Sequence, residues 1–316
     1  MNLYIGIIFK IKNNKLLWYD FYKIIYIEYI GLIYFWHMDK IKIHNLKKEK
    51  IKIIFVTNIN NLLHDFFKTV SLPDIKLYFM NKEIREKTNF NDWIIKNITN
   101  DQIEFLKINI HFSSDCLERL DEKLKNLNKN LDNNIWKICV FSEMFFNLPF
   151  TLQDVIFIPI SYIDTSMNKI SLFDSLFNKN ILINKNFSKT LIHEKIHLLQ
   201  RYNQKNWNNY IIEKTKWIIF NNELIFNLTL INNNKIIYNP DTYYVETIFG
   251  YSINNKYYHG QMFLNSKNEI KNIWYEMINS KNKIYLYPIS YSVIKYEHPY
   301  EELAYILSND LINIAS

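Results

Sequence analysis

Hydrophobic residues recur along this chain at two different spacings, which predict a mixture of helices and strands. Between residues 116 and 133, leucines return every three or four positions, which predicts an amphipathic helix with one buried face. The leucines that set this period are Leu117, Leu120, Leu124 and Leu127. Three other runs are rich in β-branched and aromatic residues and predict strands: IKIIFVT after Lys50, IWKICVF (residues 135–141) and DVIFIPISYI (residues 154–163).

Pro159 lies inside the third of these runs, and it changes where that strand is expected. A proline cannot donate a hydrogen bond to a neighbouring strand, so prolines within sheets are confined mainly to edges. We therefore expect Asp154–Ile163 to be an edge strand. The free backbone groups of such an edge can pair with another chain.

The C-terminal half continues the alternation of elements. A last helix is predicted to begin at Pro299, because proline suits the first helical turn and Glu301 and Glu302 follow it. The segments before it are predicted to be a helical or mixed stretch (207–222), β-hairpin pieces with the turn sequence NPD (235–264) and a final strand (283–296).

These elements predict an α+β fold, without internal repeats, that follows a divergent N-terminal extension of residues 1–48. The main domain is expected to cover residues 49–316. Within it we distinguish an N-terminal α+β part, at about 49–185, from a second part at about 186–316, which contains the chemistry described below.

Composition adds little that is specific to function. Asn, Ile, Lys and Tyr are abundant, and their codons are AT-rich, which indicates mutational bias in the genome. The net charge is +7, but the lysines are spread along the whole chain. Their one local cluster, Lys40–Lys52, is interpreted as a solvated linker, because no RNA-binding signature or Cys/His finger accompanies it.

Several classes of site are absent from the sequence. Cys116 and Cys139 are the 2 cysteines, too few for a disulfide framework and without the spacing of a structural metal site. The 4 glycines cannot build a glycine-rich phosphate loop, and no G-x-S-x-G motif is present. Serine or cysteine nucleophiles are therefore not indicated.

The N-terminal region is apolar but does not predict a membrane span. A spanning helix needs about 20 mostly uncharged residues. The apolar stretch Leu17–Trp36 is interrupted by three charged residues, Asp20, Lys23 and Glu28. The first residues also lack the pattern of a secretory signal. We expect a soluble, intracellular protein.

The segment TLIHEKIHLLQ, Thr190–Gln200, contains two of the 8 histidines at HExxH spacing. On a helix, His193 and His197 project from one face, and two imidazoles so placed can bind one tetrahedral ion. Glu194 points beside that ion, where it can take a proton from an activated water. The surrounding residues are apolar, so the helix is expected to be buried and its polar trio to need partners.

This segment resembles the extended active-site pattern of the zincin metallopeptidases. Thr190 stands three residues before the first histidine and apolar residues follow the second, whereas Lys195 replaces a residue that is usually uncharged. Scattered blocks between Asn147 and Leu307 also look like metallopeptidase-like proteins of large AT-rich DNA viruses. The resemblance implies a zincin-like fold, one zinc ion per chain and a viral metalloprotease, in the host cytoplasm or the virion.

The third metal ligand is not on the same helix. Position 203 is Asn203, so the HExxHxxGxxH continuation of the metzincins is excluded. In gluzincin-type zincins a glutamate from a later helix completes the site, which leaves four candidates here: Glu213, Glu246, Glu301 and Glu302. We favour Glu301, because HPYEELAY resembles a third-ligand helix and Ala304 would allow close packing.

The resemblance also implies a mechanism of peptide-bond hydrolysis by an endopeptidase. Zinc would be held by His193, His197 and Glu301, and Glu194 would be the general base. A further donor would stabilise the oxyanion, and the candidates near the last helix are His298, Tyr296 and Tyr291. A protein or peptide substrate would bind along the edge strand expected near Asp154–Ile163.

Two other functions are consistent with the same residues. A catalytically inactive zincin-fold protein could keep the metal as a structural element and act in interactions or in a virion, although the presence of Glu194 argues against this. A nucleic-acid-associated protease would instead use the Lys40–Lys52 cluster to reach DNA-bound proteins, and its DNA binding would depend steeply on salt.

Overall fold

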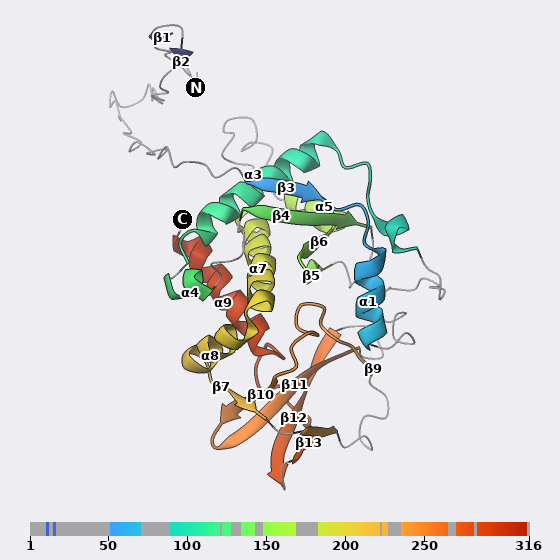
Figure 1. The fold of residues 1–316 in the computed structure, drawn as a ribbon, viewed down its shortest axis with the longest axis vertical. Coiled ribbons are helices and arrows are strands. Elements are labelled where there is room, and N and C mark those ends of the chain that lie inside the picture. The colour runs from blue at the N-terminus through green and yellow to red at the C-terminus, as the bar shows by residue number, and fades with distance from the viewer. Residues whose placement is uncertain are drawn as a thin grey trace, which may run out of the picture. The chain divides into compact units, whose positions relative to one another are not determined.

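The computed structural model describes most of the chain after residue 50 (Figure 1). The described residues are 11–12, 15–16, 51–70, 89–120, 122–127, 134–142, 148–168, 183–221, 223–226, 235–264, 270–280 and 283–314.

The chain divides into two units, Met1–Glu49 and Lys50–Ser316. In the first unit the described residues form one short antiparallel pair, β1 (Ile11–Lys12) with β2 (Lys15–Leu16). The apolar stretch Leu17–Trp36 lies outside the described residues, and so does all of the Lys40–Lys52 cluster except its last two positions. The predictions made for these segments remain predictions.

A four-stranded sheet opens the second unit and lies against the helix that contains the HExxH motif. Its order is β3-β4-β6-β5, and it is mixed: β3, β4 and β6 run parallel, whereas β5 is antiparallel to β6. The prediction of strands after Lys50 and at 135–141 is confirmed. The strands are β3 (Lys52–Phe55), β4 (Ile135–Phe141), β5 (Phe150–Leu152) and β6 (Val155–Pro159).

The prediction that Asp154–Ile163 forms an edge strand is wrong. Its strand part, β6, lies between β4 and β5, and its last residues belong to helix α5 (Ile160–Asn168). Pro159 is tolerated because it is the final residue of β6, opposite Phe141 at the end of β4, where the ladder stops. The antiparallel edge strand is β5 instead, and a peptide cannot pair with β6.

Helices surround this sheet, and their ends follow the local sequence. Thr99 and Gln102 form a reciprocal capping box at the start of α3 (Asn100–Leu117), and the Asn184 side chain accepts a hydrogen bond from the Phe187 N–H at the start of α7 (Lys185–Tyr202). In the described residues the other helical elements are α1 (Asn60–Val70), the 3₁₀ turn η2 (Phe90–Trp93), α4 (Glu122–Leu127), α8 (Gln204–Lys214) and α9 (Pro299–Ile314).

The single helix predicted over residues 116–133 is not observed. The chain leaves α3 at Leu117 and re-enters a helix at Glu122. At this junction the N–H groups of Arg119 and Leu120 bond three residues back, which tightens the last turn of α3. Leu117, Leu120 and Leu124 are nevertheless all buried, so the leucine spacing identified the buried face and missed the break.

A second sheet follows and is antiparallel except for one pair. Its order is β7-β10-β11-β12-β13-β8, with β9 also pairing β11 and with β13 parallel to β8. The predicted hairpin between 235 and 264 is present as β10 and β11, joined by Asn254 and Asn255 at positive φ. The strands are β7 (Trp217–Phe220), β8 (Glu223–Phe226), β9 (Lys235–Ile236), β10 (Ile248–Ile253), β11 (Lys256–Leu264), β12 (Ile270–Ser280) and β13 (Lys283–Ile289).

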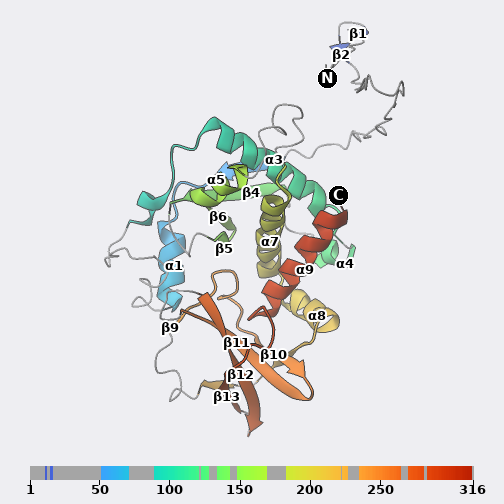
Figure 2. The same ribbon diagram turned by 180° about the vertical axis from the view of Figure 1, so that it is seen from behind.

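The fold is therefore α+β, and α7 lies at its centre. Figures 1 and 2 show α7 below the first sheet, with α9 on one side and α1 on the other. Helix α7 contacts α3, α9, β5 and β6, and its apolar residues belong to the largest hydrophobic cluster. Among the described helices, none combines the length and the apolar character that crossing a membrane requires.

Candidate metal centre

The two histidines of α7 face each other from inside the core. Their neighbours Ile192 and Ile196 are completely buried, and burial of one such side chain stabilises a fold by about 1.5–3 kcal/mol. The Nε2 atoms of His193 and His197 lie 3.0 Å apart, with the ring planes at 84°. The helix thus directs two ring nitrogens at one point, as the spacing predicted.

Glu301 lies across the open side of this pair. Its Oε2 is 3.3 Å from His193 Nε2, and its Oε1 is 3.4 Å from His197 Nε2. Ligands of a tetrahedral zinc ion, bonded at 2.0–2.1 Å, are separated from one another by about 3.3–3.4 Å. The three side chains therefore form a largely buried group that could hold a metal ion, and its dimensions fit one ion of zinc size.

The other glutamates considered as third ligands lie elsewhere. Glu302 accepts a hydrogen bond from Trp217 Nε1 at 2.6 Å. Glu213 is half exposed, with its carboxylate 3.7 Å from Lys214 Nζ, and Glu246 is exposed. Of the four candidates, the structure brings Glu301 to the histidines.

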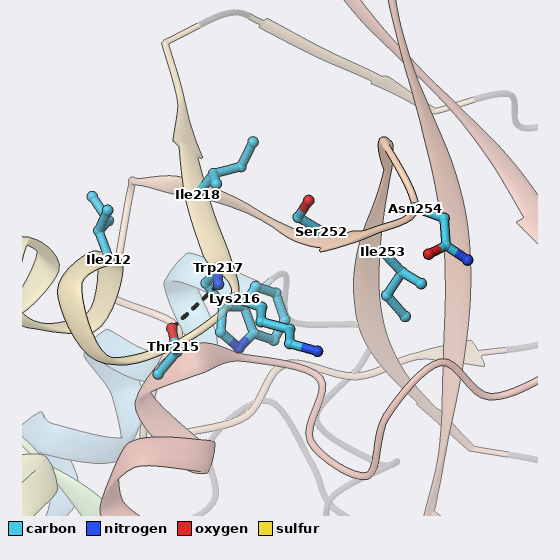
Figure 3. A pocket seen from close by; sticks show the side chains of 8 residues that line it. All are labelled: Ile212, Thr215, Lys216, Trp217, Ile218, Ser252, Ile253 and Asn254. Carbon is cyan, nitrogen blue, oxygen red and sulfur yellow. Dashed lines mark hydrogen bonds between the residues drawn. The ribbon is translucent and has the colours of Figure 1, made fainter.

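A cavity of about 420 Å³ lies beside Trp217, the residue that holds Glu302 (Figure 3). It lies where α8 passes into β7, and Trp217 forms part of its wall. The Trp217 backbone N–H donates to Thr215 Oγ1 at 3.2 Å, which fixes the start of β7, while its indole donates to Glu302. The indole thereby holds the Glu302 carboxylate beside the start of β7.

Gln200, one helical turn after His197, fixes the proton position on that histidine. Its Nε2 donates to the carbonyl of Tyr300 at 3.2 Å, so its Oε1 is left to accept from His197 Nδ1 at 2.9 Å. With its proton on Nδ1, His197 presents the Nε2 lone pair to the metal position. This role was not predicted from the sequence, although Gln200 is the last residue of the segment Thr190–Gln200.

Asn239 performs the corresponding task for Glu301. Its Nδ2 donates to Glu301 Oε1 at 2.7 Å and to Glu297 Oε1 at 3.0 Å. Its Oδ1 accepts from the Asp241 N–H at 2.9 Å, which closes the turn that the sequence NPD predicts. The sequence thus indicated the turn but not the contact of its first residue with the metal centre.

Glu194 is buried beside this group without a complete set of partners. Only 4% of its surface is exposed, and its Oε2 has no hydrogen-bond partner in the described part of the chain. Burial, and then the Asp241 carboxylate, raise the pKa of Glu194 well above its usual value. A buried carboxylate in this state destabilises the fold unless a ligand or proton satisfies it.

Charges within the group compensate one another. Burial by itself would raise the pKa of Glu301, but His197 and His193 beside it hold that pKa well below its usual value. Burial would likewise lower the pKa of His197, whereas Glu301 and Asp241 raise it to about 10. This anionic environment attracts a cation, either a proton or a metal ion.

The predicted oxyanion donors precede α9 in the chain, and two of them, His298 and Tyr296, contact residues of α9. His298 Nδ1 accepts from the Tyr300 N–H at 3.2 Å, and burial lowers the pKa of this ring to about 3, so it is neutral. Tyr296 packs on the ring of Tyr305 at 5.1 Å, and burial raises its pKa. Tyr291 is 57% exposed. Their catalytic role remains a prediction.

The edge strand β5 is already engaged at its middle residue, Thr151. The Thr151 N–H donates to Asp241 Oδ1 at 2.6 Å. Arg201 Nη2 lies 3.4 Å from the Thr151 carbonyl oxygen and 3.0 Å from its Oγ1. The Arg201 guanidinium also stacks on the ring of Tyr244 at 4.4 Å. Backbone pairing of a peptide with β5 at this position requires these contacts to open.

Lys195, where the sequence departs from the zincin pattern, has a structural role. It is 2% exposed, and its Nζ donates to the carbonyl of Ile135 at 2.8 Å and lies over the ring of Trp136. The lysine therefore joins α7 to the start of β4, and its charge is directed into the core of the domain.

Comparison of the chain with protein-family models, with curated proteins and with solved structures finds no match.

Proposed function

We propose that this chain is a zinc-dependent peptide hydrolase of the gluzincin type, with His193, His197 and Glu301 as ligands and Glu194 as general base. The single observation that carries the proposal is the buried group in which two Nε2 atoms and one carboxylate lie 3.0–3.4 Å from one another. Two histidines and one glutamate are the ligand set of several catalytic zinc sites, which leave a fourth position open.

The residues present divide the chemistry among them. Bound zinc supplies a Lewis acid that lowers the pKa of a water toward about 7. Glu194 accepts the proton of the attacking water and then delivers it to the leaving amine. Gln200 and Asn239 keep His197 and Glu301 in the orientation that ligation needs, through the bonds given above. His298, as a neutral imidazole with Nδ1 already accepting, has its other ring nitrogen available as a donor.

The state of Glu194 supports catalysis over a purely structural metal. A structural site gains nothing from a carboxylate that is buried next to the ligands with an unpartnered Oε2. Such a group destabilises the fold by an amount on the order of 1–3 kcal/mol. Its presence is explained if the carboxylate acts on a water or substrate.

The second candidate is an inactive zincin-fold protein that uses the metal as a structural element. One observation favours it: Asp241 and Arg201 already occupy the middle of edge strand β5, where the substrate backbone would bind. This engagement would weaken or prevent peptide binding at the strand while leaving the metal site intact.

One experiment separates the two functions. Full-length protein loaded with zinc is incubated with casein and with an internally quenched peptide library, alongside Glu194→Gln. The proposal expects cleavage by the wild type, a loss of about 10³-fold or more in the variant, and equal zinc content in both. Zinc in both proteins with cleavage by neither would support the structural alternative.

A further inference from the structure

A second cavity, of about 210 Å³, lies between the start of α9 and strands β10 and β11, next to the metal centre. Asn239, which bonds Glu301, is part of its wall. So are Glu297 and His298, which immediately precede α9. The cavity is therefore separated from a metal ligand by one side-chain amide. Its volume is below the roughly 300–1,000 Å³ of pockets for drug-sized ligands and suits one amino-acid side chain.

The acidic residues that line this cavity contrast with the excess of basic residues in the whole chain. The sequence has 38 Lys and Arg against 31 Asp and Glu. The residues that line the cavity nevertheless include two glutamates, Glu246 and Glu297, and neither lysine nor arginine. Its two histidines do not offset this charge, because burial lowers the pKa of His259 and of His298.

The walls provide faces for the long stem of a basic side chain. Three aromatic residues, Tyr238, Tyr243 and Phe249, are among the residues that line the cavity. Aromatic faces attract ammonium and guanidinium groups by about 0.5–2 kcal/mol per contact. An aromatic cavity with carboxylates therefore favours an amphipathic cation over a neutral or acidic group.

The position of Glu297 is fixed by the second sheet. A Cβ atom on Gly260 of β11 would lie 2.7 Å from both the Cα and the carbonyl oxygen of Glu297, so only glycine allows this approach. Asn239 holds the Glu297 carboxylate from the other end. Burial of this carboxylate raises its pKa, so a cationic partner would relieve an unfavourable environment.

We propose that this cavity receives a lysine or arginine side chain of the substrate, so that the enzyme cleaves peptides next to a basic residue. The inference rests on the proposed peptidase function and adds its substrate class. It also explains how a substrate is selected when the middle of edge strand β5 is engaged by Asp241 and Arg201: recognition depends on a side chain more than on backbone pairing.

The first test measures specificity in the full-length, zinc-loaded protein. Quenched peptides carry Lys, Arg, norleucine or Glu in turn at each position that flanks the cleaved bond. At one position, kcat/KM for Lys or Arg is expected to exceed that for norleucine by about tenfold or more. Glu297→Gln is expected to reduce this ratio several-fold. Glu276→Gln, a glutamate on β12 that pairs with Lys256, is the matched control and should keep the ratio.

The second test measures binding without catalysis. Full-length Glu194→Gln is titrated with Nα-acetyl-lysine methylamide and with the norleucine analogue, and binding is followed by NMR shifts of the protein. Saturable binding of the lysine compound alone, weakened by Glu297→Gln, supports the cavity even if no peptide is cleaved. Cleavage without any basic preference overturns the cavity proposal and leaves the peptidase in place. Equal or absent binding of both compounds overturns it as well.

Discussion

The two halves of the candidate metal centre are built in different ways. His193, Glu194 and His197 come from one continuous turn of α7, surrounded by completely buried isoleucines. Glu301 comes from the first turn of α9, and the side chain of Asn239, in the turn before β10, holds it in place. The first half is specified by the spacing of its residues within one helix and by their burial in the core. The second half forms only where α7, the first turn of α9 and the turn that contains Asn239 meet. The second half should therefore be the more sensitive to small changes in position.

The largest effect is expected in the helix half. His197→Ala removes a fully buried ligand and should lower zinc content from about one per chain to near zero, because two protein ligands hold zinc weakly. Zinc per chain is measured by mass spectrometry of the purified protein. His111→Ala, an exposed histidine of α3, is the control and should keep its zinc. Full zinc in His197→Ala would show that the ion binds elsewhere.

In the half that α9 contributes, the two adjacent residues Glu301 and Glu302 can be compared directly. Glu301→Gln should lose most of its zinc, because an amide is a poorer ligand than a carboxylate. Glu302→Gln should bind zinc like the wild type, since Glu302 contacts Trp217 and an amide oxygen can still accept that bond. Zinc titration of both variants shows which glutamate is the third ligand. Loss of zinc binding in Glu302→Gln alone would assign that role to Glu302.

Intermediate effects are expected where a side chain orients a ligand. Gln200→Ala and Asn239→Ala should each lower zinc affinity by about 10–100-fold, which is typical of lost partners of metal ligands. We expect Asn239→Ala to be the more severe of the two, because Glu301 lacks the support that core packing gives to His197 on α7. Competition with a chelator measures both affinities. The reverse order would contradict the contrast between the two halves.

The smallest effect on the metal is expected from Trp217→Phe. The change removes the indole donor to Glu302, and hydrogen bonds to charged groups contribute about 1.5–3 kcal/mol. The free energy of unfolding, measured in urea with zinc removed, should fall by about 1.5–3 kcal/mol. Zinc affinity should change far less than in Asn239→Ala. A change in zinc affinity as large as that of Asn239→Ala would mean that Trp217 positions Glu301 as well as Glu302.

The sequence predicted the parts of this structure that are encoded locally. The HExxH spacing placed two histidines on one helical face, and the Pro299 start of α9 was predicted correctly. Gln200 and Asn239 could not be assigned roles, because their contacts join residues as distant as Tyr300 and Glu301. Which amide reaches which carboxylate depends on how the sheets pack.

Three expectations differ from the structure. The final strand predicted over residues 283–296 ends at Ile289. The other two failed for physical reasons that are visible in the structure. A proline is disfavoured inside a ladder, but Pro159 is the last residue of β6, where the ladder stops. The strand can therefore remain internal. The leucine period across residues 116–133 continues over the break between α3 and α4 because the turn keeps the same face buried. Periodicity therefore reported which residues are buried better than where elements end.

The central claim is most directly tested by anomalous diffraction at the zinc edge from crystals of the zinc-loaded, full-length protein. The account predicts one strong peak within about 2.0–2.2 Å of His193 Nε2, of His197 Nε2 and of a Glu301 oxygen. A peak at another site, or a site that stays empty at zinc saturation, would contradict it.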